Sequence, residues 1–350
     1  MRKTLFALSL LLCSVAAFAQ SHLISGTATY PNGTAIRLWK TTGRTLDLVD
    51  STTITNNSFK FKGTYGEGLY ALGVAPSNMA IIAMDNAEKE TVFSVQGVKW
   101  DNGISCTSGN RNQLWFEYVK KENEFTQKKR ALNIRWKKDK DSTAEKELTD
   151  LEASFNTYQL ECTKRDQQTT TKSFVSQLID WKREPSKDKA HYWDNLNFSD
   201  ERVVHTTVLN DRIQSFMRQF SKGTESGFID CIGLLTEKAH ANDRVYEFVL
   251  NEMLTGFYES GMENITLYLM DNFINDESSR SPVTPSRPTA YTKPLHRCNI
   301  RGSLSSGAVG AAIAKQKLRK SQSSAKTTQP RKLPLWGIRW TTTRTHGNRR

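Results

Sequence analysis

Short runs of alternating apolar and polar residues occupy the first part of the chain, and they predict β-strands. The run at 23–30 is followed by a Pro31-Asn32-Gly33 turn and a second run at 35–39, which predicts strand, turn and strand. Similar runs recur at short intervals, at 46–54, 58–62, 68–74, 79–84 and 91–95. This spacing is typical of a small antiparallel β-sandwich, which we expect over residues 20–108.

The hydrophobic period changes from two to between three and four at about Asn112, which predicts helices. One apolar face consists of Leu148, Leu151, Phe155, Tyr158 and Cys162, and an earlier one of Trp115, Tyr118 and Phe125. The charged stretch at 139–143 separates the two faces, so an antiparallel hairpin of two long helices is expected. Four further amphipathic segments begin near Leu209, Phe228, Val245 and Ile265. The fold class predicted is therefore α+β, with a helical domain over 110–275.

The positive net charge of +13 comes from the C-terminal segment. Residues 280–350 contain 16 Lys or Arg and no Asp or Glu, whereas the preceding 279 residues hold 33 basic and 36 acidic side chains. The segment is also rich in Ser, Thr and Pro and shows little periodicity, which predicts a disordered basic tail over 276–350. An abrupt change of this kind is also typical of a shifted reading frame or a truncated product, and we keep both hypotheses.

The N-terminus has the three parts of a secretory signal peptide. Met1-Arg2-Lys3 is positively charged, residues 4–15 are largely apolar, and Ala17-Phe18-Ala19 is a small-x-small cleavage site. The apolar run is shorter than the ~20 residues that span a bilayer. We expect cleavage after Ala19 and export to the periplasm or cell envelope, with membrane attachment as a weakly supported alternative.

Four cysteines remain after that cleavage: Cys106, Cys162, Cys231 and Cys298. They are too far apart for a Cys-x-x-Cys redox pair or a zinc-finger site. The favoured interpretation is buried or incidental thiols. Because the compartment is oxidising, a disulfide between Cys162 and Cys231 is the leading alternative.

Motifs for catalysis are absent from the body of the chain, and no cofactor or metal is expected. The sequence has no GxSxG, HExxH or P-loop, and no GxGxxG with the acidic residue of a dinucleotide site. His191 and His205 lie near acidic residues but at no established ligand spacing, so surface or capping roles are favoured. Cations between Lys129 and Lys138 alternate with acidic residues, which favours a solvated helix face over an anion site.

The segment 191–202 stands out by its aromatic content. Three aromatic residues precede Ser199, which is a good helix N-cap, and acidic residues follow it in the expected first turn. Helix docking and initiation explain the segment. It also supplies the candidate interaction surface, which consists of Tyr192, Trp193, Asp194, Phe198 and Asp200.

This segment resembles the "YWDnfdFsDeR" block in the helical middle region of exported TlpA-like thiol:disulfide interchange proteins of Gram-negative bacteria. Residues 21–105 are similar to the β-rich domain that precedes it in those proteins, through Gly26, Leu38, Asp50-Ser51, Phe59, Phe61 and Gly63. The resemblance covers about 21–275. Thr207 departs from it, standing where the resemblance leads us to expect Pro.

The resemblance implies a following thioredoxin domain whose Cys-x-x-Cys pair lies at a helix N-terminus. No such pair follows in this sequence. We therefore expect a non-catalytic envelope module that docks or positions substrates for an unknown envelope protein, with no DNA as partner. One alternative is a thioredoxin-family oxidoreductase that uses distant cysteines such as Cys162 and Cys231. Another is a protein that binds anionic surfaces or nucleic acid through its basic tail.

Overall fold

The computed structural model describes residues 21–165 and 173–274, which divide into two compact units. The first unit extends to Lys187 and includes 193–196 and 205–208; the second comprises 188–192, 197–204 and the chain from Leu209 onward. The predicted signal peptide and the predicted basic tail, which includes Cys298, lie outside the described residues. Within those residues the α+β class is confirmed.

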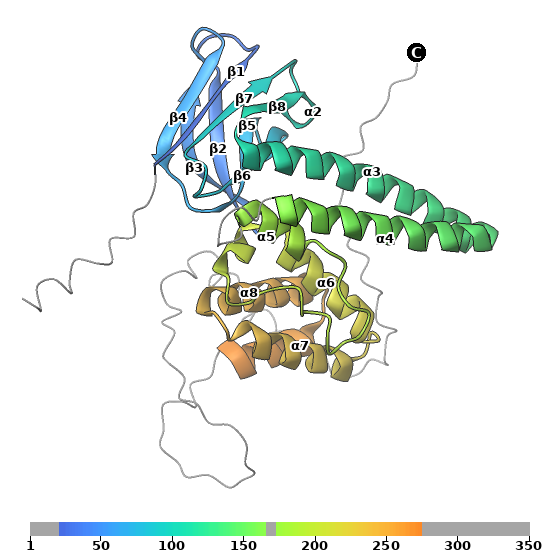
Figure 1. The fold of residues 1–350 in the computed structure, drawn as a ribbon. Coiled ribbons are helices and arrows are strands. Elements are labelled where there is room, and N and C mark those ends of the chain that lie inside the picture. Colours follow the sequence, from blue (N-terminus) through green and yellow to red (C-terminus); the bar gives the residue numbers. More distant parts are fainter. Residues whose placement is uncertain (1–20, 166–172, 275–350) are drawn as a thin grey trace, which may run out of the picture. The chain divides into compact units, whose positions relative to one another are not determined.

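Two four-stranded sheets form the β-rich part of the first unit (Figure 1). One sheet has the order β4 (Ser58–Thr64), β1 (Ser21–Ala28), β7 (Glu90–Val95), β8 (Ile104–Ser108). The other has the order β3 (Thr45–Thr53), β2 (Ala35–Thr42), β5 (Gly68–Ala75), β6 (Asn78–Met84). The predicted strands are confirmed, and the pairs are antiparallel apart from β1 and β7, which are parallel. A parallel pair needs a long crossover connection, and the strands between β1 and β7 provide it.

The apolar faces of the two sheets share one core. Ile24, Phe61 and Phe93 come from the first sheet, and Leu38 and Leu72 come from the second. Alternate residues of β1 and β4 are buried, as the two-residue period of a half-buried strand requires. The short helix α2 (Trp100–Gly103) inserts the fully buried Trp100 beside Phe59, with ring centroids 5.7 Å apart.

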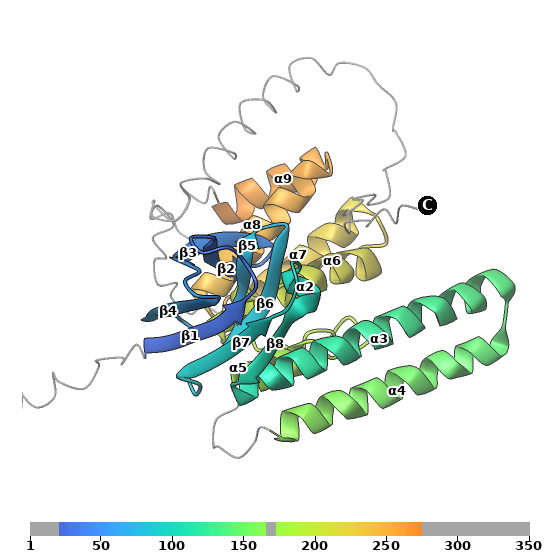
Figure 2. The same ribbon diagram turned by 90° about the horizontal axis from the view of Figure 1, so that it is seen from above.

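Helices α3 (Asn110–Asp139) and α4 (Ser142–Arg165) form the predicted antiparallel hairpin, which both views show (Figures 1 and 2). Lys140 takes a left-handed conformation at the turn, and the Asp141 carboxylate accepts the N–H groups of Thr143 and Ala144 at the start of α4. Stacked rings join the helices, with the centroids of Phe125 and Phe155 4.1 Å apart. The hairpin is therefore fixed by its turn and by aromatic packing.

The hairpin belongs to the same compact unit as the sheets, so the unit boundary differs from the one expected near residue 109. The reason lies in the first turns of α3, where Asn112 and Trp115 bond to the backbone of β6. Helix α5 (Phe174–Trp181) is tied to this unit in a similar way, because the buried Asp85 carboxylate accepts the N–H of Phe174.

The second unit is helical and confirms the four predicted amphipathic segments. They are α6 (Val208–Phe220), α7 (Glu225–Ala239), α8 (Asp243–Glu259) and α9 (Glu263–Leu269), with the π-turn η2 (Met270–Ile274) after α9. Thr224 and Asn242 cap α7 and α8 with their side-chain oxygens. Phe228 and Phe257 meet edge to face between α7 and α8. Across both units, none of the described helices is long and apolar enough to cross a membrane.

Candidate functional site

The candidate site lies along the outer edge of strand β6. Its neighbour in the sheet is β5, and among the described strands none follows it in the sheet order. The Asn112 side chain instead donates to the Ala83 carbonyl at 2.8 Å and accepts the Ala83 N–H at 2.8 Å. One side-chain amide thus makes both bonds that a residue of an added strand would make.

Trp115 continues this attachment one helical turn later. Its indole N–H donates to the Ile81 carbonyl at 3.1 Å. Asn112 and Trp115 are three residues apart, so they lie on one face of α3 and both reach the same strand edge. They fix α3 against β6 at the Ala83 end of the strand.

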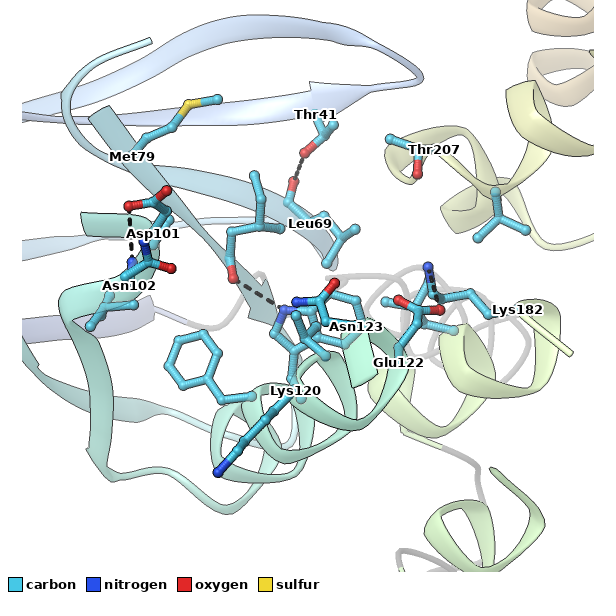
Figure 3. Close-up of a pocket in the computed structure, with 18 of the residues that line it drawn as sticks. Thr41, Leu69, Met79, Asp101, Asn102, Lys120, Glu122, Asn123, Lys182 and Thr207 are labelled. Atoms are coloured by element: carbon cyan, nitrogen blue, oxygen red, sulfur yellow. Dashed lines mark hydrogen bonds and ion pairs between the residues drawn. The ribbon is translucent and has the colours of Figure 1, made fainter. Parts of the chain in front are cut away.

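An open pocket of about 880 Å³ lies beside β6 and is called here the β6 groove (Figure 3). Met79, Ala80 and Ile81 of β6 contribute to its lining, as do Phe116, Val119 and Lys120 of α3. Asp101 and Asn102 lie at one end of the pocket, and Lys182 and Thr207 lie at the other. The groove is therefore built by elements that are far apart in sequence.

Charged groups at the groove are partly neutralised. Glu122 on α3 and Lys182 on α5 form an ion pair at 3.1 Å, and the Tyr118 hydroxyl donates to the same carboxylate. Lys120 is exposed and forms no ion pair with any residue of the described ranges. In the part of the chain that the structure describes, no group of three His, Cys, Asp or Glu residues is placed to hold a metal ion.

The three described cysteines are free thiols with raised pKa values. Burial, reinforced by the Glu88 carboxylate, raises the pKa of Cys106 on β8 to about 12. Burial also raises the pKa of Cys162 on α4 and of Cys231 on α7, and both side chains are fully buried. A nucleophilic thiol in a redox protein requires the opposite shift.

Cys162 and Cys231 belong to different units and each is a free thiol, and the disulfide considered between them stays a prediction. The favoured interpretation of buried thiols is confirmed for these two residues. Cys106 is partly exposed, and its Sγ lies 3.1 Å from the Ser108 carbonyl.

Alkylation measures the state of these thiols directly. At pH 9, a pKa of about 12 leaves roughly one Cys106 in a thousand ionised, whereas the usual value of 9.0 leaves half. We expect iodoacetamide to label Cys106 of the folded protein at least a hundredfold more slowly than that of the denatured chain at pH 9, and the folded rate to rise toward pH 12. Peptide mass spectrometry assigns the labels. Rapid labelling of folded Cys106 at neutral pH would contradict this expectation.

The aromatic members of the candidate interaction surface are core residues. Tyr192 is buried in the second unit, where it exchanges backbone and side-chain hydrogen bonds with Arg212 and packs on Phe216. Trp193 and Phe198 are 2% and 6% exposed. These three residues are therefore wrong as members of an exposed surface, because their side chains are buried.

The two acidic members of that set remain accessible to different degrees. Asp194 is exposed, whereas Asp200 is held in an ion pair with Arg202 at 2.6 Å. Asp200 also accepts the N–H of Arg202, so it takes the capping role expected of Ser199, and a 3-10 helix, η1 (Glu201–His205), follows. Neither carboxylate belongs to the β6 groove.

His191 and the basic helix face match the structural interpretations favoured for them, whereas His205 is buried and is not the surface residue expected. His191 is exposed beside Asp188, and His205 is buried with Nδ1 3.1 Å from the Thr41 carbonyl. On the hairpin, Lys129 pairs with two glutamates and Arg135 pairs with Asp141 and Glu147.

No family model, curated protein or solved structure matches this chain. The resemblance to TlpA-like proteins therefore rests on the residues quoted for it. What the protein does must be inferred from the geometry of its own groups, and the β6 groove is the feature that the sequence did not reveal. The sequence feature that points to the groove is a polar and an aromatic residue, Asn112 and Trp115, on one face at the start of a long helix.

Proposed function

We propose that this protein is a non-catalytic module of the cell envelope that docks a polypeptide partner in the β6 groove. The observation that carries the proposal is the groove itself, in which a sheet edge, apolar side chains of α3 and an exposed cation line one open pocket. Sites that bind ligands are commonly pockets of about 300–1,000 Å³ with apolar walls and a few polar groups. The partner is an exported polypeptide, in keeping with the predicted signal peptide.

A docking role is supported over thiol chemistry by the state of the cysteines. None of the described thiols lies in the groove, and the pKa of each is raised, chiefly by burial. Dithiol exchange needs a thiolate with access to its target. The likeness to the accessory regions of thiol:disulfide interchange proteins agrees with a module that holds a substrate while reactive groups elsewhere act on it.

Site-specific photo-crosslinking tests the proposal. The photoreactive amino acid p-benzoylphenylalanine is placed at Lys120, which lines the groove, or at Lys146, which is exposed on α4 away from it. The probe is reduced, carboxymethylated lactalbumin, a soluble protein that stays unfolded. We expect several-fold more crosslinked product from position 120 than from position 146. Equal yields from the two positions would contradict docking in the groove.

A further inference from the structure

The register of β5 and β6 determines which backbone groups of β6 point outward. Met79, Ile81 and Ala83 pair with Gly73, Ala71 and Leu69, at alternate positions along the ladder. In an antiparallel ladder, successive residues direct their N–H and C=O groups alternately toward the neighbouring strand and away from it. Ala83 directs both groups outward to Asn112, so Ile81 and Met79 direct theirs outward as well.

Helix α3 forms hydrogen bonds with only some of these outward-facing backbone groups. The Ile81 carbonyl accepts the Trp115 indole N–H. Within residues 21–165 and 173–274, no hydrogen bond reaches the Ile81 N–H or the N–H and C=O of Met79 from outside the sheet. Both residues line the β6 groove. The groove therefore contains two donors and one acceptor at the spacing of a β-ladder.

The other groups that line the groove indicate which kind of ligand it would bind. Phe116 and Val119 of α3 provide apolar contact. Lys120 on α3 is an exposed cation and Asp101 at one end of the groove is a carboxylate, and neither has an ion pair among the described residues. An extended segment with apolar side chains and a carboxylate on the α3 side complements these groups. A second copy of β6 fits poorly, because each copy carries α3 bonded to its own edge at Ile81 and Ala83.

We propose that β6 binds an extended polypeptide segment as an added strand, through the backbone of Met79 and Ile81, with an acidic residue of the segment facing Lys120. This inference rests on the proposed docking function and specifies its mode. Strand addition draws its affinity from main-chain hydrogen bonds and its selectivity from alternate side chains. The segment would complete a sheet edge that α3 covers at one end only.

Backbone methylation of a peptide tests this mode on the unmodified protein. The probe is a fluorescent peptide of alternating Val and Thr with one central Glu, in two isomers that carry N-methyl groups at either the odd or the even positions. Only one set of peptide N–H groups faces β6, because strand residues alternate in direction. We expect one isomer to bind at least about tenfold more weakly than the unmethylated peptide, and the other within about twofold of it.

A variant removes the donor from the protein instead. Ile81→Pro deletes the Ile81 N–H, which the β5 ladder does not use, and edge strands tolerate proline at such positions. Ile81→Val keeps the N–H and serves as the matched control. We expect about tenfold weaker peptide binding for Ile81→Pro and little change for Ile81→Val. If Ile81→Pro does not fold, the methylated peptides still decide the question.

The outcomes separate this inference from the docking function. Crosslinking at position 120 together with equal binding of both methylated isomers would overturn strand addition and leave docking in place. Loss of the crosslink would overturn both. A dimer of the free protein that Ile81→Pro disrupts would assign the edge to a second copy and would also overturn the proposal.

Discussion

Replacing Asn112 by alanine should lower the free energy of unfolding by about 3–5 kcal/mol, since a buried donor and a buried acceptor lose their partners together. Asn112 is 1% exposed, and its amide makes both hydrogen bonds with Ala83, whose backbone is covered by α3. Each unsatisfied buried backbone group costs about 1–3 kcal/mol. Urea unfolding followed by circular dichroism measures the change.

The matched control is Asn133→Ala on the same helix. The Asn133 side chain donates to the carbonyl of Lys129 in its own helix and reaches no strand. We expect this variant to lose less than about 1 kcal/mol, as is usual for partly exposed side chains. A similar decrease in the free energy of unfolding for the two variants would mean that the hydrogen bonds to Ala83 do not stabilise the fold.

Asp85→Ala should destabilise the protein by about 3 kcal/mol, because its carboxylate provides charged hydrogen bonds inside the first unit. Asp85 is 2% exposed, and its two oxygens accept the N–H groups of Phe174 at 2.8 Å and of Ala87 at 3.0 Å. The first of these bonds holds the start of α5 at the end of β6. Thermal unfolding and urea titration both report the loss.

Asp85→Asn separates the charge from the hydrogen bonds. The amide oxygen keeps one acceptor, while its NH₂ group cannot accept from the second N–H. We therefore expect a stability between those of the wild type and Asp85→Ala. Asp101→Ala is the control, because within the part of the chain that the structure describes the Asp101 carboxylate accepts only the exposed N–H of Asn102. Wild-type stability in both Asp85 variants would exclude an anchoring role for this carboxylate.

The strands and long helices were predictable because one face of each is buried. Alternation in β1 and the three-to-four spacing around Phe155 follow from that burial, so the pattern is visible in sequence. Helix α2 and strand β8 were missed because they are short, and β8 has no apolar alternation. The parallel pairing of β1 with β7 depends on tertiary assembly, which local pattern does not encode.

The site was less predictable than the fold. Aromatic content drew attention to Tyr192 and Trp193, yet large aromatic side chains contribute most when they are buried, and here they are. The β6 groove depends on a strand being at a sheet edge and on a side-chain amide that bonds across 29 residues. Neither the edge position of a strand nor a hydrogen bond between distant residues leaves a pattern in the local sequence.

The parallel pair of β1 and β7 affects how the protein folds as it is made. Leu23 lies opposite Glu90, so the first sheet closes only after most of the β-rich sequence has been synthesised. Pairings between distant parts of a chain form slowly, since the loop between them must be closed first. A nascent chain that ends before β7 leaves β1 and β4 without their third strand, and a protein of this design must be kept from aggregating until that strand has been synthesised.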